Sequence, residues 1–163
     1  MVSGLWLVLL VLAALVLTAV VAGQTGAFKG RTPAKLGLHE GKLKRPSRTP
    51  NSVSSQAKLW SETASTQRAM IAPLALVGDG PATLARLRAI VESIPGAQVV
   101  KVEPDYLYAT FTSVVFKFVD DVEFWFDPAN AVVQVRSASR VGRSDKGVNR
   151  ARIEAIRERL AAA

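Results

Sequence analysis

The side chains best suited to chemistry lie close together near the C-terminus, in the run RSASRVGRSDKGVNRARIE at positions 136–154. Five of these residues are arginines, whose planar guanidinium groups bind carboxylates and phosphates through paired hydrogen bonds. A strand is expected to end in this run and a helix to begin, so the side chains can meet at one junction. The candidate residues, which we call the Arg–Ser cluster, are Arg136, Ser137, Ser139, Arg140, Arg143, Ser144, Asp145, Asn149 and Arg150.

The first interpretation of this cluster is an anion-binding site. Arg140, Arg143 and Arg150 would converge with the free N–H groups at the start of the helix on a phosphate or a carboxylate. Ser144 or Asp145 would cap that helix, because a short polar side chain accepts hydrogen bonds from the amides of the first turn.

The second interpretation is an internal set of ion pairs. Asp120 and Asp121 would each accept hydrogen bonds from one arginine of the cluster and hold the domain together. Asn149 is expected to face inward on the helix and to bond to the backbone of a neighbouring loop, because a buried amide needs partners. If it lined a cleft instead, it would join Arg140 and Ser139 as a ligand group. The sequence does not decide between the two interpretations.

The residues that common catalytic mechanisms need are missing. The chain has no cysteine, and its single histidine, His39, lies in a basic stretch. Nucleophilic and metallohydrolase schemes therefore lack their usual groups. Adjacent acids such as Asp120 and Asp121 point to opposite faces of a strand, so they do not converge with Glu123 and Asp127 on a metal ion. We assign no catalytic residue, no metal site and no cofactor.

Residues 2–23 contain no charged side chain. At about 1.5 Å per residue, this segment is long enough to cross a hydrocarbon layer of about 30 Å. The alternative is a cleavable signal peptide with Val20 and Ala22 at the cleavage site. The length of the apolar run, and the lack of a preceding Lys or Arg, favour a retained transmembrane anchor.

Residues 24–64 are predicted to be a basic Gly/Pro/Ser-rich linker that partly lies on the domain. Positions 24–50 hold seven basic residues and one acidic residue, which is most of the net charge of +8. The Lys29–Arg48 segment is therefore expected to contact anionic lipid headgroups. No nucleic-acid binding is expected, because residues 51–163 are nearly neutral.

Residues 65–163 are predicted to form an α+β domain with the order β-α-β-β-β-β-α. Apolar residues at helical spacing predict helices over 82–94 and 148–162. Local connections between the strands predict a mostly antiparallel sheet in two layers with the helices. Alternating residues predict strands over 70–74, 98–103, 105–112, 122–126 and 131–136, with 113–119 a turn or a further strand.

Trp125 is out of phase with its aromatic neighbours on the predicted strand 122–126 and is a candidate surface anchor.

Three separated motifs carry a resemblance to a known family. They are TPNSVSSQ at 49–56, DDVEF at 120–124, and RSASRVGRSD at 136–145 followed by GVNR at 147–150, with LGLHEGKL at 36–43 upstream. In this order they resemble the domain-of-unknown-function family fourteen-ninety-nine over roughly residues 36–160. The resemblance implies an envelope-associated protein of bacteria or organelles, often with an N-terminal membrane segment or signal, and no established reaction. Many relatives carry cysteine where this chain has Ser52, so thiol chemistry at that position is excluded here.

These observations favour a single-pass membrane protein with a non-enzymatic binding or accessory domain. The charge rule favours a cytoplasmic domain, whereas the resemblance favours an envelope location. One alternative is a hydrolase-type enzyme that acts on an anionic envelope substrate, with Asp121 as the base. The other is a structural subunit of a membrane complex, in which Trp125 packs against a partner.

Overall fold

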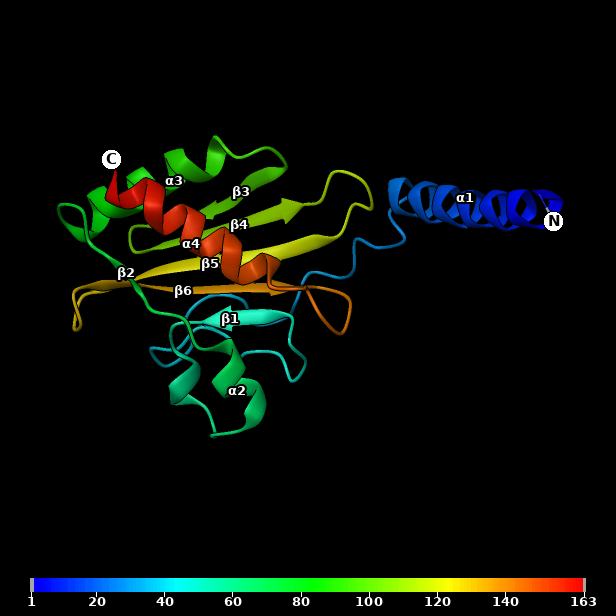
Figure 1. Ribbon diagram of the computed structural model, residues 1–163. Coiled ribbons are helices and arrows are strands. Elements are labelled where there is room, and N and C mark those ends of the chain that lie inside the picture. Colours follow the sequence, from blue (N-terminus) through cyan, green and yellow to red (C-terminus); the bar gives the residue numbers. More distant parts are fainter. Residues whose placement is uncertain (1, 163) are drawn as a thin grey trace.

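Four long segments with alternating apolar residues form the centre of a sheet in the computed structural model, which describes residues 2–162 (Figure 1). Each strand pairs antiparallel with the next along the chain. This arrangement confirms the predicted α+β class. The central strands are β3 (Ala97–Val102), β4 (Tyr106–Thr112), β5 (Val119–Asp127) and β6 (Val132–Ser139).

Two short strands complete the sheet on the far side of β6. Strand β1 (Ser52–Ser54) pairs antiparallel with residues 136–138, and β2 (Leu74–Ala75) pairs with residues 132–133. The resulting order is β1-β6-β5-β4-β3, with β2 also beside β6. The 3-10 helix η1 (Ala57–Leu59) and helix α2 (Ala64–Ala69) connect β1 to β2.

The packed part of the chain begins earlier than residue 65, where the sequence placed its start. Leu43 and Ala57 are fully buried, and β1 lies within the segment that was assigned to the linker. A strand of three residues carries too little periodicity to stand out in a sequence. Its place is fixed by β6, which supplies the hydrogen-bonding partner.

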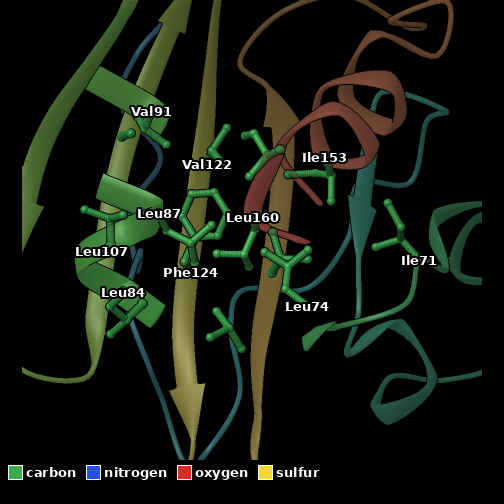
Figure 2. Packing of buried hydrophobic residues seen from close by; sticks show 14 of the residues in the cluster. Ile71, Leu74, Leu84, Leu87, Val91, Leu107, Val122, Phe124, Ile153 and Leu160 are labelled. Carbon is green, nitrogen blue, oxygen red and sulfur yellow. The ribbon is translucent and has the colours of Figure 1, made fainter. Parts of the chain in front are cut away.

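Helices α3 (Gly80–Glu92) and α4 (Val148–Ala161) cover one face of the sheet (Figure 1). Asp79 caps α3 by accepting the Ala82 amide at 2.7 Å. The main core lies between these helices and the strands, as Figure 2 shows. It includes Leu84, Leu87, Val91, Leu107, Val122, Phe124, Val133, Val135, Ile153, Ile156 and Leu160.

The opposite face of the sheet is covered by residues 30–47, which we call the N-terminal strap. Its Leu43 packs with Tyr106, Tyr108 and Trp125 in a second buried cluster. Trp125 is only 9% exposed, and its indole N–H donates to Asp105 at 3.3 Å. The prediction that Trp125 is a surface anchor is therefore wrong. The alternation of side chains along β5 does place Trp125 on the opposite face of the sheet from Phe124, but the strap covers that face.

Helix α1 (Val2–Gln24) projects from the domain (Figure 1). Its large apolar side chains from Leu5 to Leu17 are 47–66% exposed. The stretch Gly4–Gln24 is long and apolar enough to span a membrane, a criterion that an N-terminal signal sequence also meets. The C-terminal end of α1 meets residues 113–118, which form the loop between β4 and β5 rather than a strand.

Candidate functional site

Strand alternation divides the Arg–Ser cluster between the two faces of the sheet. Arg136 pairs with Glu123 across the ladder, and Ser137 pairs with Val122. Because neighbouring residues in a strand point to opposite faces, Arg136 and Arg140 lie on the strap face. Ser137 and Ser139 lie on the helix face. The cluster is therefore two networks, not one pocket.

The first network joins Arg140 to Asp121 on the strap face. Arg140 Nε donates to Asp121 Oδ2 at 3.0 Å, and its Nη2 donates to Oδ1 at 2.8 Å. The Tyr108 hydroxyl donates to the same Oδ1 at 2.6 Å. The Asp121 side chain is fully buried and that of Arg140 is 5% exposed. The hydrogen bonds to Asp121 raise the pKa of Arg140 above its usual value, so this arginine stays charged.

A second ion pair lies beside it on the same face. Arg136 Nη1 donates to Glu123 Oε2 at 3.1 Å, with both side chains buried. The Tyr106 hydroxyl donates to Glu123 Oε1 at 2.8 Å, and the Gly37 amide of the strap donates to the same oxygen at 2.7 Å. Burial, and then the charge of Glu123, raises the pKa of Tyr106. The strap is thus hydrogen bonded to a carboxylate on the sheet.

On the helix face, Asn149 lies at the centre of a separate hydrogen-bond network. It is fully buried, and its Oδ1 accepts from the Ser137 hydroxyl at 2.5 Å. Its Nδ2 lies 3.0 Å from Ser139 Oγ, 2.8 Å from Asp145 Oδ2 and 3.1 Å from the carbonyl of Asn51, which directly precedes β1. This amide therefore joins α4, β6 and the segment before β1, including the loop backbone that the sequence predicted as its partner.

Arg152 is the member of this network that sequence reasoning missed. Its Nη2 bonds to Asp120 Oδ2 at 2.5 Å, and its Nη1 donates to Asn149 Oδ1 at 2.8 Å and Ser137 Oγ at 3.0 Å. The guanidinium also lies 4.7 Å from the ring centroid of Phe111. A signal was present, because Arg152 follows the inward-facing Asn149 by three residues on a helix.

Of the two predicted capping residues, Asp145 accepts amides at the start of α4, although Gly147 occupies the N-cap position. Gly147 has a φ of 85°, whereas Ser144 is exposed and accepts from the Lys146 amide. Asp145 supplies the oxygens, accepting from the amides of Asn149 at 2.9 Å and Gly147 at 3.1 Å. Burial alone would raise the pKa of Asp145, but these hydrogen bonds outweigh it and lower the pKa.

The three arginines of the anion-binding interpretation do not converge. Arg140 points to the strap face, and Arg150 donates to the carbonyls of Met70 at 2.7 Å and Arg68 at 3.1 Å. Arg143 is exposed and, within residues 2–162, has no ion pair or hydrogen bond. The first amides of α4 are already occupied by Asp145. Of the three, Arg140 is in an internal ion pair, Arg150 bonds to backbone carbonyls and Arg143 lies in solvent.

A hollow of about 690 Å³ lies between α4 and the loop 113–118. Asp120, Arg152 and Ser139 are among its lining residues, so it borders the helix-face network. A second hollow of about 370 Å³ lies on the other side of residues 144–146, between Thr49, Arg68 and Arg150. Of the two, only the larger adjoins the loop that meets α1.

The acids of the sheet are poorly placed for catalysis. Asp121 is fully buried and is occupied by Arg140 and Tyr108, so a substrate cannot reach it in this conformation. Asp120 lies on the other face and is bound by Arg152. In the part of the chain that the structure describes, no group of three or more His, Asp or Glu side chains is arranged to hold a metal ion.

The motifs of the sequence meet at this corner of the fold. The segment 49–56 contains β1, which pairs with the 136–138 segment of β6, and β6 pairs with the 120–124 segment of β5. The family described as "Protein of unknown function (DUF1499)" matches residues 42–160. The chain belongs to this family. A comparison with curated proteins finds no match. The match to DUF1499 begins beside Leu43, close to where the buried part of the domain begins.

Ser52 of the 49–56 motif is the first residue of β1. Its side chain is 7% exposed, and its hydroxyl accepts from the Ser47 amide at 2.8 Å. The hydroxyl therefore ties the end of the strap to β1. In this chain the position serves packing and hydrogen bonding.

Proposed function

We propose that this protein is a membrane-anchored, non-enzymatic binding domain that works at the surface of the bilayer holding α1. One observation carries the proposal: α1 is attached directly to the loop 113–118. The Gln24 side chain donates to the Val115 carbonyl at 3.1 Å, and the ring of Phe28 stacks on Phe118 at 5.1 Å. A Cβ at Gly23 would lie 2.5 Å from the Phe116 carbonyl oxygen, so helix and loop are in close contact.

The loop itself has the composition of a membrane-interface segment. Val114 is 74% exposed, Val115 is 49% exposed and Phe118 is 38% exposed. Apolar side chains that would be unfavourable in water are stabilised when they enter the acyl boundary beside an anchor. Lys117 lies in the same loop and suits the headgroup layer. These side chains support a placement of this face of the domain against the bilayer.

Basic residues of the N-terminal region support an anionic partner. Lys29, Arg31, Lys35, Arg45 and Arg48 are exposed. Each basic side chain near an anionic leaflet contributes about 1 kcal/mol of attraction. The buried carboxylates, by contrast, are held by arginines and tyrosines, which supports a binding role over a catalytic one.

Spin labels can test the placement directly, because the chain has no native cysteine. The full-length protein in lipid nanodiscs would carry a nitroxide at Val114→Cys or, as a control, at the half-exposed Val100→Cys on β3. Oxygen is concentrated in the bilayer, whereas a polar nickel reagent stays in water. We therefore expect oxygen to increase the relaxation rate of the label at 114 more than the nickel reagent does. At position 100 we expect the nickel reagent to have the larger effect. Equal polar accessibility at both positions would contradict the proposal.

A second label tests the anionic partner. Ala34 is an exposed residue of the strap between the basic side chains Arg31 and Lys35. We expect a nitroxide at Ala34→Cys to lose mobility when the nanodisc contains anionic lipid in place of zwitterionic lipid. High salt should restore the mobility, because it screens exposed charges. Mobility that is independent of lipid charge would show that the basic segment does not contact headgroups.

A further inference from the structure

We infer that the larger hollow, between α4 and the loop 113–118, binds a single-chain amphiphile with an anionic head group, drawn from the adjoining bilayer. The inference rests on the proposed placement of the domain at the membrane. The hollow of about 690 Å³ is within the range of about 300–1,000 Å³ typical of small-molecule sites. Its walls, its charges and its position each point to such a ligand.

The walls of the hollow are mostly apolar and are kept apart by small residues. Ala151 and Ala155 lie on the side of α4 that faces the hollow, and both are exposed rather than packed in the core. The opposite wall includes Ile94, Phe111 and Phe118. A larger side chain at either alanine would fill the space that these rings leave open. Such a groove along a helix suits an extended hydrocarbon chain.

The charged residues that line the hollow, three bases and two acids, carry a net charge of +1. Its two acids are already satisfied, because Asp120 is bound by Arg152 and Asp145 accepts the amides at the start of α4. The other two charged lining residues are Lys146 and Arg159. Arg159 donates to the neutral Ser93 hydroxyl at 3.3 Å, and Lys146 is exposed without an acidic partner in the described chain. An anionic head group would complement this net positive charge.

The hollow is continuous with the membrane-facing loop. Phe118 lines the hollow and also stacks on Phe28, just after α1. The β6–α4 loop, which holds Lys146, lies on the same side of the domain as α1 (Figure 1). The hydrocarbon tail of an amphiphile that leaves the bilayer can therefore pass Phe118 and enter the hollow. The head group of the amphiphile remains near Lys146. This continuity favours a membrane amphiphile over a water-soluble anion.

Photo-crosslinking of the full-length protein in nanodiscs tests the inference. The probe is a long-chain fatty acid with a diazirine in its chain, and crosslinked peptides are mapped by mass spectrometry. We expect crosslinks on α4 near Ala151 and Ala155. Ala155→Trp should reduce them about fivefold or more, equivalent to about 1 kcal/mol. The matched control is Ala85→Trp at an exposed position of α3 outside the hollow, which should leave the yield unchanged.

The head group is tested with Lys146→Glu and a fatty alcohol that carries the same diazirine chain. We expect the variant to lower the crosslinking of the fatty acid several-fold and to leave that of the alcohol unchanged. Equal loss with both probes would overturn the anionic head group, and absence of α4 crosslinks in the unmodified chain would overturn the site. Thermal unfolding of each variant shows whether α4 is intact.

Failure of this inference is distinguishable from failure of the proposed function. If the spin label at position 114 is in the bilayer but no crosslink maps to α4, the hollow is not the site and the membrane placement stands. If the label at 114 is aqueous, the placement fails and the bilayer is not the source of the ligand.

Discussion

The two faces of the sheet are buried by different physical means. The helix face is dominated by aliphatic and aromatic side chains such as Leu107, Phe124 and Val135, packed under α3 and α4. The strap face carries two buried ion pairs, Arg140–Asp121 and Arg136–Glu123, beneath a segment with little regular structure. A helix can cover an apolar face through side-chain contacts alone. The strap reaches its face partly through backbone hydrogen bonds, such as that from Gly37 to Glu123.

The difference explains why Arg136 and Arg140 of the arginine-rich motif are occupied by carboxylates of the sheet. An arginine in a binding site needs unpaired donors in contact with solvent, whereas Arg136 and Arg140 are buried against carboxylates on the next strand. Buried pairs of this kind contribute little net stability compared with apolar residues of the same volume, but breaking one is costly. The motif thus links β6 to β5 through two buried ion pairs, while the proposed ligand site lies beside it.

The largest expected effect is on the strap face. Arg140→Ala would leave Asp121 buried without its charged partner, so we expect the free energy of unfolding to fall by about 3–5 kcal/mol. Arg143→Ala is the matched control, because its side chain is exposed and unpaired, and should change stability by less than about 0.5 kcal/mol. Denaturant unfolding of the full-length chain in micelles measures both.

A double variant then separates the two faces. Arg140→Met combined with Asp121→Leu should recover most of the lost stability, because both charges are removed together. Phe124→Ala on the helix face should cost about 3–5 kcal/mol through the cavity it leaves, and no charge-removing second substitution should restore it. If the double variant is as unstable as Arg140→Ala, the ion pair contributes to the free energy of unfolding by more than the cancellation of its two buried charges.

The next effect is expected at Asn149. Asn149→Ala removes the amide that links Ser137, Arg152 and Asp145. Because buried polar groups are then left without partners, we expect the free energy of unfolding to fall by about 2–3 kcal/mol. Asn130→Ala is the control, since Asn130 is an exposed turn residue whose side chain bonds to Asp127. A loss of stability at 149 no larger than that at 130 would mean that the network around Asn149 is not cooperative.

Much of the domain could be predicted from the sequence because its long elements have clear periodicity. Helical spacing in 82–94 and 148–162, and alternation in the four long strands, were sufficient for the α+β class and the antiparallel sheet. The inward orientation of Asn149 also followed from helical spacing alone. These features depend on local pattern and burial, which a sequence displays directly.

The missed features depend on partners that are distant in sequence. Strand β1 has three residues and forms only because β6 offers an edge. Trp125 is buried only because Leu43 and the strap cover it. The separation of Arg136 and Arg140 from Ser137 and Ser139 follows from alternation once β6 is known to extend to Ser139. The strand predicted from the sequence ends at residue 136. The sequence therefore predicts that all of these side chains lie together at the junction between that strand and the following helix.

The smallest effect we predict is a change in alkaline stability at Tyr108. Burial, and then its hydrogen bond to Asp121, raises the pKa of Tyr108 to about 12 from 10.0. The folded state therefore favours the neutral phenol, and stability that is present below pH 10 is lost as pH rises from about 10 to about 12. The slope contributed by one such group is at most about 1.4 kcal/mol per pH unit.

Unfolding of Tyr108→Phe between pH 9 and about pH 12 checks this expectation. The variant lacks the ionising hydroxyl, so its stability should fall less steeply with pH than that of the unmodified chain, even if it is lower at neutral pH. Tyr106→Phe should flatten the curve in the same direction, because burial and Glu123 raise the pKa of Tyr106 as well. Parallel curves for all three proteins would mean that the strap opens before either phenol ionises, so that the strap face exchanges with solvent more readily than the helix face.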